Sequence, residues 1–483
     1  MINFSIVVAT DNNNGIGLYK DEKYSIPWKC KEYKKFFKKI TKGTTFGKKN
    51  VVIMGKNTYL SLPKKLSERI NIIITSNHKI FKDEITFSNL DNSLNYCNSI
   101  KNKINKVFVI GGSQLYFTAL KSDYLEYVYW NRININYNCN INFKLPKIFH
   151  DKYLLDESIN RNNITFMKFE KKSDEINYLN ILNEILEDGD ERQTINSVTK
   201  SIFGKKLEFN LKDQFPIITT KKIFVRDIFE ELIWFLKGKT DSKLLKNNNV
   251  NIWKENTTKE FLESRNLSYS EGDIGNMYGF QLNHAGCNYE GCDKNYNNKG
   301  FNQIEYCLNL LKTDKYSRRI IMTTFSPDKA DQGVLYPCHG IVIQWYVREY
   351  NNCNYLSCHM YQRSADAFLE VPVNISSYSL LTYLICQLIN SDLKYKGSKY
   401  LPDKLIISFG DLHIYESHYN DVKEQIKRNI YPFPKIKFKY MMNSISNIKW
   451  EDIQLINYQF HPTIKANIIA VFQISQYLII FCP

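Results

Sequence analysis

The chain has 483 residues, a length that predicts more than one folded unit, because single domains usually hold about 100–200 residues. Hydrophobic residues make up 43% and aromatic residues 14% of the sequence, which is enough for packed cores and excludes a globally disordered or fibrous protein. The net charge is +16, of which residues 1–172 carry +15 and residues 173–483 carry +1. A basic part of this kind favours an anionic partner, such as nucleic acid, a membrane surface or phosphorylated small molecules, although solvated surface lysines give the same count.

The sequence shows no secretory or membrane signal. Met1–Ala9 is apolar but lacks a basic leader and a small-residue cleavage site, and no run of 18 apolar residues occurs. The 11 cysteines are scattered and odd in number, which favours reduced thiols over a disulfide framework. His284, Cys287 and Cys292 come nearest to metal-site spacing but lack a second pair, so no metal is expected. We expect a cytoplasmic protein that does not bind membranes.

Residues 1–172 alternate short apolar runs with amphipathic stretches, the pattern of an α/β domain. The expected strands are Phe4–Ala9, Val51–Met54, Asn71–Thr75, Lys106–Ile110 and Leu125–Trp130, and the expected helices are Lys31–Ile40 and Ser113–Leu120. The chain then turns polar and charged at Lys171–Glu175, where the charge balance also changes. Residues 173–178 are therefore predicted to form a short linker.

The part after the linker mixes helical and strand patterns. In chain order these are the helices Tyr178–Leu186 and Ile228–Leu236, the strands Ile320–Phe325, Ile341–Val347 and Tyr355–Tyr361, the helix Tyr378–Ile389 and the strand Leu405–Phe409. The Asn- and Gly-rich stretch Asn283–Gly300 is predicted to be a surface loop or insertion. We find no internal repeat.

A strand, a glycine turn and a helix start follow one another at Lys106–Leu120. Gly111 and Gly112 would let the backbone approach a phosphate, and the N-terminus of the helix that begins at Ser113 would favour an anion. A Gly-Gly pair alone is more often only a turn, so the neighbouring segments decide its meaning.

The first 172 residues contain seven short segments in a definite order. They are Ile2–Ala9, Gly15–Gly17, Ile26–Trp28, Phe36-Phe37 with Thr41, Met54–Thr58, Arg69 with Asn71, and Val109–Gly112 with Tyr116. In order and spacing these segments resemble dihydrofolate reductase. The resemblance implies an α/β domain with a mixed central sheet, which would bind NADPH and dihydrofolate.

The same resemblance implies roles for individual residues. Gly111, Gly112, Ser113 and Gln114 would lie against the pyrophosphate of NADPH, and Lys56, Thr58, Thr75 and Ser76 would hold the ribose and 2′-phosphate. Arg69 would bind the glutamate carboxylate of the folate, because a planar guanidinium offers paired hydrogen bonds. The loop Gly15–Tyr24 would close over the nicotinamide.

One catalytic position departs from the family pattern. Protonation of N5 of dihydrofolate calls for a buried carboxylate, which the family places five or six residues after the tryptophan. Those positions are Tyr33 and Lys34 here, whereas Glu32 lies four residues after Trp28, and Asn131 stands where a threonine is usual. We expect the helix register to slide by one residue so that Glu32 is the catalytic carboxylate. The alternatives are an impaired reductase and a Glu32 that only stabilises the helix N-terminus.

A second constellation surrounds a cysteine. Cys338 lies in Leu335–Gly340, just before a predicted strand. A thiolate nucleophile needs positive surroundings to lower its pKa, whereas a lone buried cysteine is usually structural. Four arginines could supply that charge and bind a phosphate as well: Arg226, Arg318, Arg319 and Arg363.

Further segments follow between Tyr178 and Val471. They are Thr219–Lys222 with Arg226, Phe229–Phe235, Tyr278-Gly279 with Gln281, Tyr336–His339, Gln362–Ser364 with Asp366, Pro372 with Asn374, Gly410-Asp411 with His413 and Tyr415, and Pro432–Pro434. They resemble thymidylate synthase, which implies an α+β synthase domain over residues 179–471. The whole chain is thus similar to the bifunctional dihydrofolate reductase–thymidylate synthases of protists and plants.

The carried-over roles describe the methylation of dUMP to dTMP, with 5,10-methylenetetrahydrofolate as cosubstrate. Cys338 would attack C6 of dUMP, Glu231 would organise proton transfers through water, and Tyr278 would lie beside the nucleophile. The substrate-binding residues would be Arg318 and Arg319 from the other subunit with Arg363 and Ser364 on the phosphate, Asn374 on the uracil, His413 and Tyr415 on the deoxyribose, Asp366 and Trp253 at the folate ring, and His339. The cross-subunit arginines imply an obligate homodimer through the synthase domain.

Three features depart from the synthase pattern. Arg192 lies two residues earlier than the usual phosphate-loop arginine, and Glu370 replaces a usual glycine near two anionic substrates. Residues 472–483 extend beyond Ala470 or Val471, where family chains normally stop, either as a gene-model artefact or as a tail that hinders closure. In the second case, truncation after Val471 would raise synthase turnover.

The sequence therefore predicts a cytoplasmic bifunctional enzyme whose substrates are dUMP, folates and NADPH, with no metal. The alternatives are the same family with one impaired domain, or a basic nucleic-acid-binding module. The second is disfavoured by scattered lysines without an aromatic stacking motif, so no nucleic acid is required.

Overall fold

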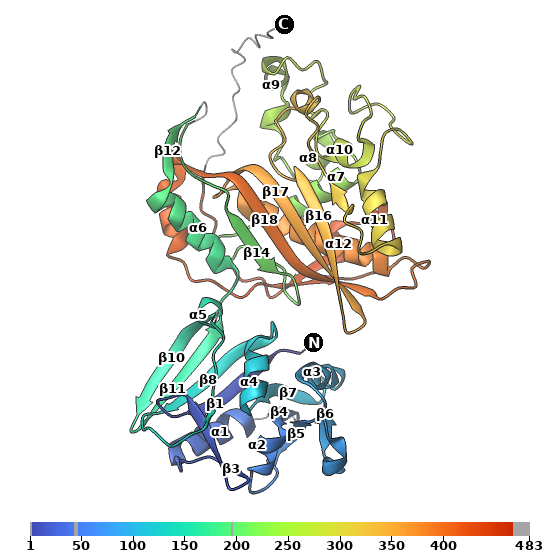
Figure 1. The fold of residues 1–483 in the computed structure, drawn as a ribbon. Coiled ribbons are helices and arrows are strands. Elements are labelled where there is room, and N and C mark those ends of the chain that lie inside the picture. The colour runs from blue at the N-terminus through green and yellow to red at the C-terminus, as the bar shows by residue number, and fades with distance from the viewer. Residues whose placement is uncertain (1, 43–46, 148, 195–196, 467–483) are drawn as a thin grey trace. The chain divides into compact units, whose positions relative to one another are not determined.

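The computed structural model describes residues 2–42, 47–147, 149–194 and 197–466 (Figure 1). Its internal contacts divide the chain into two compact units, Met1–Lys172 and Ser173–Pro483. The predicted C-terminal extension, residues 472–483, lies outside the described residues. Within the described ranges, no helix has both the length and the apolar character needed to cross a membrane.

The first unit is built on an eight-stranded sheet. Its order is β10 (Tyr153–Arg161), β11 (Ile164–Lys171), β8 (Leu125–Ile133), β1 (Phe4–Thr10), β7 (Ile104–Val109), β4 (Lys49–Gly55), β5 (Arg69–Ile74) and β6 (Ile85–Phe87). The strands from β8 to β6 pair in parallel, whereas β11 pairs antiparallel with both β8 and β10. The sheet is therefore mixed, as the resemblance implied.

Helices cover both faces of this sheet, which explains why its central strands are continuously apolar. On β1, Ile6 and Val8 face the core cluster that includes residues of α3 (Leu90–Ser99) and α4 (Ser113–Leu120). The alternating Val7 faces the opposite cluster, to which α1 (Lys31–Lys42) contributes Phe36 and Phe37. The remaining elements are α2 (Lys56–Leu60), α5 (Phe149–Lys152) and a small sheet of β2 (Gly15–Lys20), β3 (Lys23–Ser25) and β9 (Ile141–Asn142).

The second unit combines a seven-stranded sheet with helices. The sheet order is β12 (Asp190–Gln193), β13 (Val198–Phe203), β18 (Lys399–Tyr415), β17 (Cys353–Asp366), β16 (Val342–Tyr350) and β15 (Ile321–Met322), and β14 (Lys206–Asn210) also pairs with β18. The other elements are α6 (Glu175–Asp188), α7 (Val225–Leu236), α8 (Lys243–Lys246), α9 (Lys259–Ser264), α10 (Gly279–His284), α11 (Gln303–Thr313), α12 (Glu370–Asn390), α13 (Tyr419–Ile426), β19 (Lys435–Phe438) and β20 (Ile453–Ile456).

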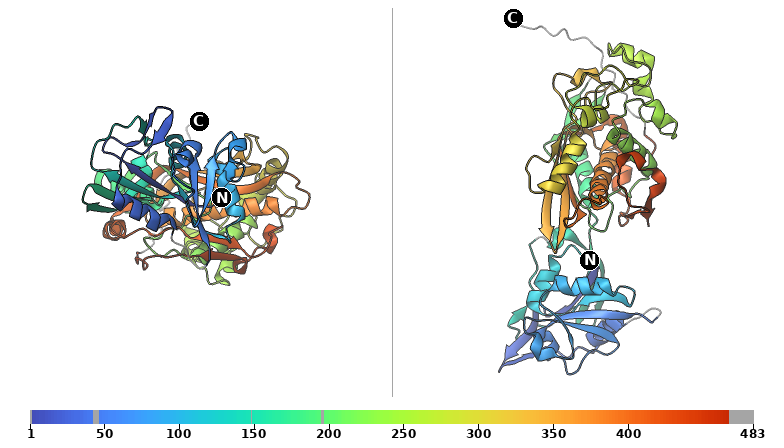
Figure 2. Two further views of the ribbon diagram at one scale, coloured as in Figure 1. Left: turned by 90° about the horizontal axis from the view of Figure 1, so that it is seen from below. Right: turned by 90° about the vertical axis from the view of Figure 1, so that its right-hand side faces the viewer.

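Helix α12 explains the layering of this unit. It packs along β17 and β18 on one face of the sheet (Figures 1 and 2). Ile375, Leu384 and Ile389 are among its fully buried residues, so the helix is apolar on several sides. Its first residue, Glu370, comes four residues after Asp366, the last residue of β17, which brings the start of the helix close to the end of that strand.

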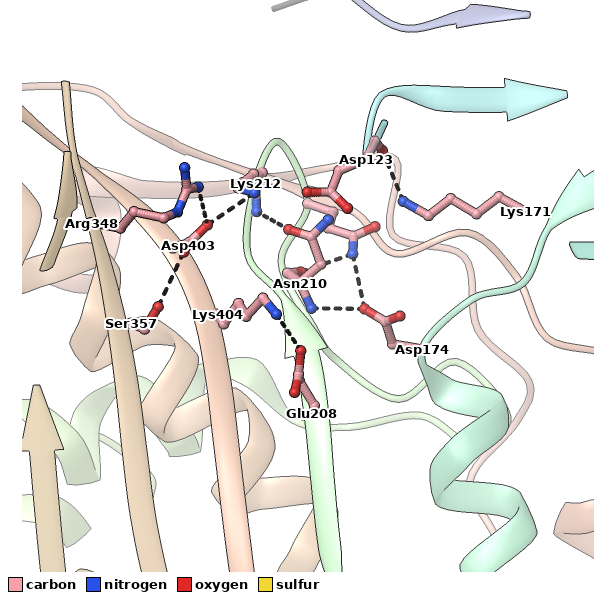
Figure 3. Close-up of polar contacts among 11 residues, drawn as sticks. Asp123, Lys171, Asp174, Glu208, Asn210, Lys212, Arg348, Ser357, Asp403 and Lys404 are labelled. Atoms are coloured by element: carbon pink, nitrogen blue, oxygen red, sulfur yellow. Dashed lines mark hydrogen bonds and ion pairs between the residues drawn. The ribbon is translucent and has the colours of Figure 1, made fainter. Parts of the chain in front are cut away.

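The predicted linker 173–178 is wrong for most of its length, because α6 begins at Glu175. The Glu175 side chain is fully buried and accepts hydrogen bonds from the backbone N–H and the hydroxyl of both Thr219 and Thr220, at 2.7–2.9 Å. Asp174 also anchors this start of the unit, since its Oδ2 accepts the N–H of Asn210 (Figure 3). The acidic residues Asp174 and Glu175 are therefore hydrogen-bonded within the second unit and do not form a solvent-exposed linker.

A second polar centre ties three strands together. Asp403 of β18 is almost fully buried and pairs with Lys212 at 3.0 Å and with Arg348 of β16 at 3.3 Å (Figure 3). Its other oxygen accepts the hydroxyl of Ser357 on β17. These contacts satisfy the buried carboxylate and hold β16, β17 and β18 in register.

Most expected elements occur within a few residues of their predicted limits. The largest differences are at the helix expected at Tyr378–Ile389, which begins eight residues earlier at Glu370, and at the strand expected at Leu405–Phe409, which extends six residues farther at each end. Of the strand expected at Ile320–Phe325, only Ile321–Met322 pairs with β16. The following residues leave the sheet, because the backbone N–H of Thr323 donates to the side chain of Gln303 instead. Of the loop predicted at Asn283–Gly300, the first two residues belong to α10, and the rest forms no helix or longer strand.

Candidate active sites

A cavity of about 790 Å³ opens in the first unit. It lies where α2 begins, where β5 ends and where the turn between β7 and α4 passes. All eight residues predicted to bind NADPH line it: Lys56, Thr58, Thr75, Ser76, Gly111, Gly112, Ser113 and Gln114. The structure thus brings together residues that are up to 58 positions apart in the sequence.

The glycine turn in this cavity fits close approach by a phosphate. Gly111 has φ +143°, and a Cβ there would lie 2.8 Å from Thr58 Oγ1. Gly112 is the N-cap of α4, and the first two residues of that helix, Ser113 and Gln114, line the cavity. The N-terminal N–H groups of a helix have no partner within the helix and favour an anion. The chemistry of the site therefore fits a pyrophosphate, with hydroxyl groups and one lysine nearby.

The catalytic carboxylate expected at Glu32 is not in this cavity, so that prediction is wrong. Glu32 is exposed, and its nearest polar contact is the thiol of Cys30 at 3.6 Å. The helix register does not slide: Tyr33 lines the cavity instead, and among the described lining residues there is no aspartate or glutamate. Burial raises the pKa of the Tyr33 hydroxyl far above its usual value, so it stays protonated.

Two further residues of this unit have defined places. Asn131 is fully buried on β8 opposite Ala9, a cavity residue, and its amide donates to the carbonyl of Val8 at 2.9 Å. Arg69 does not line the cavity; its Nη1 donates to Thr41 Oγ1 at 2.7 Å, at the far end of α1.

In the second unit, the thiol of Cys338 has two polar neighbours. Its Sγ lies 2.9 Å from Oε1 of Glu370 and 3.4 Å from Oη of Tyr278. Tyr278 also accepts the backbone N–H of Cys338 at 3.2 Å. Burial and the Glu370 carboxylate together raise the pKa of this thiol well above its usual value.

Aromatic rings extend from this cysteine to a buried glutamate. Tyr278 stacks on His339 with ring centroids 4.4 Å apart and contacts Trp253 at 6.1 Å. The indole N–H of Trp253 donates to Glu231 Oε1 at 2.8 Å. Burial raises the pKa of Glu231 to about 7, so this group can hold or release a proton near neutrality.

His339 is held as a neutral imidazole. Burial lowers its pKa to about 4, and its Nδ1 lies 2.9 Å from the hydroxyl of Tyr378 on α12. Sequence reasoning missed Tyr378, because one tyrosine in an apolar helix carries no distinguishing signal.

The end of β17 and the end of β18 run parallel, which places their predicted substrate residues side by side. Ser364 pairs with Asp411, and Asp366 pairs with His413. The imidazole of His413 lies 2.9 Å from Asp411 and packs edge-on against Tyr415. Asn374 of α12 donates to Gln362 Oε1 at 3.0 Å, so the amide of β17 orients it.

The four arginines predicted around Cys338 are not all close to it. Arg363 donates to the carbonyls of Tyr336 and Pro337 at 3.0 and 2.8 Å, one residue before the cysteine. Arg318 and Arg319 are exposed beside β15, and Arg226 pairs with Glu230. Arg192 lies on the β12–β13 hairpin and pairs with Asp411 at 3.0 Å, next to Ser364 on the adjacent strand.

Known sequence families match this division of the chain. The dihydrofolate reductase pattern matches residues 3–172, and the thymidylate synthase pattern matches residues 176–470. A bifunctional dihydrofolate reductase-thymidylate synthase of Paramecium tetraurelia is 35% identical over 96% of this chain and 98% of its own length. The chain belongs to the bifunctional dihydrofolate reductase–thymidylate synthase family.

Other members of this family are similarly close. The Zea mays enzyme is 32% identical over 96% of each chain, and the Leishmania major enzyme is 33% identical over 96% of this chain and 94% of its own. The protein therefore has a reductase domain, which uses NADPH, and a synthase domain, which uses 5,10-methylenetetrahydrofolate, and it carries both activities. Within the described residues no group of histidine, cysteine or acidic side chains is arranged to hold a metal ion.

Proposed function

We propose that Cys338 is the nucleophile of the synthase domain and that the residues gathered around it bind dUMP and the folate. The observation that carries this proposal is the cluster of Cys338, Tyr278 and His339, which is joined to β17 because the carbonyl of Cys338 accepts the backbone N–H of Arg363. Arg363 and Ser364 would hold the phosphate, Asn374 the uracil, and His413 with Tyr415 the deoxyribose. Asp366 and Trp253 would contact the folate ring, and Glu231 would relay protons.

A coupled assay tests this assignment. The purified protein is incubated with dUMP and 5,10-methylenetetrahydrofolate, dTMP and dihydrofolate are measured, and NADPH is then added. We expect dTMP and dihydrofolate to form in equal amounts and dihydrofolate to disappear after NADPH is added. The Cys338→Ala variant should form no dTMP but should still reduce added dihydrofolate. Formation of dTMP by this variant would refute the role of the cysteine.

For the reductase domain, we propose that NADPH binds along Gly111–Gln114, with Lys56, Thr58, Thr75 and Ser76 on its 2′-phosphate side. Bound there, the cofactor supplies the hydride for the pterin. Arg69, at the outer end of α1, would bind the folate glutamate. Because Tyr33 stays protonated, the proton for N5 would come from water, and the Tyr33 hydroxyl would orient that water as a neutral donor.

We also propose a homodimer formed through the outer face of the synthase sheet. Val342 and Tyr346 of β16, Ile321 of β15 and Tyr361 of β17 point to this side and are exposed, Tyr346 by 68%. Exposed apolar and aromatic side chains on one sheet face favour a covering partner. Arg318 and Arg319 lie exposed beside this face, where they could reach the phosphate site of a second copy.

Complementation tests the dimer. An Arg318→Ala, Arg319→Ala double variant and a Cys338→Ala variant should each form little dTMP alone. Mixed dimers should regain activity, because one of their two sites keeps both its cysteine and its arginines. Absence of recovery after subunit exchange, or a monomer in sedimentation, would refute the shared site.

We further propose a reducing, cytoplasmic location, which the free thiol state of every cysteine in the described ranges supports.

A further inference from the structure

The contact between Cys338 and Glu370 is unusual for a nucleophilic cysteine. The carboxylate oxygen at 2.9 Å is closer to the sulfur than the tyrosine hydroxyl at 3.4 Å. Glu370 is held at its other oxygen too, because Oε2 accepts the backbone N–H of Asp366 at 3.2 Å. As the first residue of α12, its backbone is fixed by the helix. The carboxylate is therefore positioned, rather than merely near the thiol.

The positive charge expected to activate the cysteine is directed elsewhere. The guanidinium of Arg363 donates to the carbonyls of Tyr336 and Pro337 and stacks on the Tyr336 ring with its centre 4.8 Å from the centroid. A thiolate beside an ionised Glu370 would place two negative charges in contact with little compensation. The contact instead fits a protonated thiol that donates to a carboxylate.

We propose that Glu370 is the base that accepts the proton of Cys338 as the sulfur attacks the pyrimidine. The inference rests on the proposed role of Cys338 as nucleophile. In the step, the S–H bond breaks and its proton moves to Glu370 Oε1, while a sulfur electron pair forms the S–C6 bond. The C5=C6 electron pair moves into the C4 carbonyl and gives the enolate. One negative charge thus passes from the carboxylate to the enolate, and the site never holds a thiolate beside a carboxylate.

The surroundings of Glu370 agree with this transfer. Burial raises its pKa, which makes it a better proton acceptor than an exposed carboxylate. The charged and titratable groups facing the pair come from every neighbouring element: Asp366 and Arg363 on β17, His413 on β18, Glu231 on α7, Tyr278 before α10, and Tyr378 on α12. At Glu370, the electrostatic effect of His413 lowers the pKa and opposes that of Asp366.

Alkylation of Cys338 tests the proposal without any synthase turnover. The full-length protein, Glu370→Gln, Glu370→Gly and the exposed control Glu416→Gln are treated with iodoacetamide from neutral to alkaline pH. The rate for the Cys338 peptide is followed by mass spectrometry. We expect the pH midpoint to fall by about one unit or more in both Glu370 variants. The control should match the unaltered protein.

Turnover provides the second readout. If Glu370 is the proton acceptor, kcat for dTMP falls by about 10²-fold or more in both variants, although their thiol reacts faster with iodoacetamide. An unchanged alkylation midpoint, or an equal or higher kcat in either variant, would overturn the proposal. Glu370→Gln keeps the size of the side chain, so its thermal unfolding should stay near that of the unaltered protein. Failure of the underlying assignment is seen separately, as dTMP formation by Cys338→Ala.

Discussion

The buried carboxylate of Glu175 allows a stability effect to be worked out from its contacts. Each of its oxygens accepts one backbone N–H and one hydroxyl, all from Thr219 and Thr220. In Glu175→Gln, one oxygen becomes an NH₂ group that cannot accept. The threonine hydroxyl on that side can turn and accept from the amide, but the backbone N–H there loses its partner.

The size of the effect follows from that count. One buried N–H without a partner costs about 1–3 kcal/mol, and the bonds that remain lose their charged acceptor. Burial of the charged carboxylate, which raises the pKa of Glu175, partly offsets this loss because the amide avoids it. We expect the synthase domain to lose about 1–3 kcal/mol of unfolding free energy, and its melting temperature to fall by about 2–5 °C. Glu175→Ala, which removes both acceptors, should lose more.

Differential scanning calorimetry measures this effect. The synthase transition is identified as the one that dUMP shifts to higher temperature, because a ligand stabilises the domain that binds it. Glu187→Gln on the same helix is the matched control, since Glu187 is exposed. The ranking expected is Glu175→Ala below Glu175→Gln below the control. If Glu175→Gln melts at the same temperature as the control, the four hydrogen bonds do not stabilise the domain.

Three other predictions concern the two sites. Tyr33→Asp places a carboxylate in a cavity whose described lining has none, so reductase turnover at neutral pH should rise by about tenfold or more and its pH profile should show the titration of a carboxylate. The rate of NADPH oxidation measures the turnover, and a lower rate in a folded variant would contradict the prediction. Gly111→Ala should weaken NADPH binding by about tenfold or more while dTMP formation stays normal, because the new Cβ clashes with Thr58 and the backbone has a positive φ at this position. An unchanged NADPH affinity in a fluorescence titration would count against the turn as the binding site. The folded-state pKa of Glu231 is about 7 against an ordinary 4.5, so this group ionises first in the unfolded chain, and the unfolding free energy should fall by about 3 kcal/mol as the pH rises from about 4.5 to about 7. Urea unfolding of Glu231→Gln should show no such pH dependence, and a dependence that persists would belong to another group.

The position of the glycine turn could be predicted because the strand, the glycines and the helix that form it follow one another in the chain. A strand, two glycines and a helix start at Lys106–Leu120 form the same turn wherever they occur, and the observed helix begins at Ser113 as expected. Long apolar runs likewise predicted the central strands, since burial on both faces requires apolar residues at every position. These features depend on neighbours in the chain.

The positions of the carboxylates depend on packing between distant segments. Glu32 and Tyr33 are adjacent, and only the packing of α1 on the sheet decides that the tyrosine faces the cavity and the glutamate faces solvent. Glu175 has the same chemistry as an exposed linker glutamate, yet partners 44 and 45 residues away bury it. A charged residue is buried when donors surround it, and those donors come from elsewhere in the chain.

The order of the two domains, most of their helices and strands, and the family of the chain could be read from the sequence. Which carboxylates meet the reacting groups depends on the folded chain, because those contacts join distant segments. Cys338 and Glu370 are 32 residues apart and meet at 2.9 Å only where the loop before β16 folds back against the start of α12. Hydrogen-bond partners of this kind depend on how strands and helices pack, and side-chain spacing along the chain does not encode that packing locally.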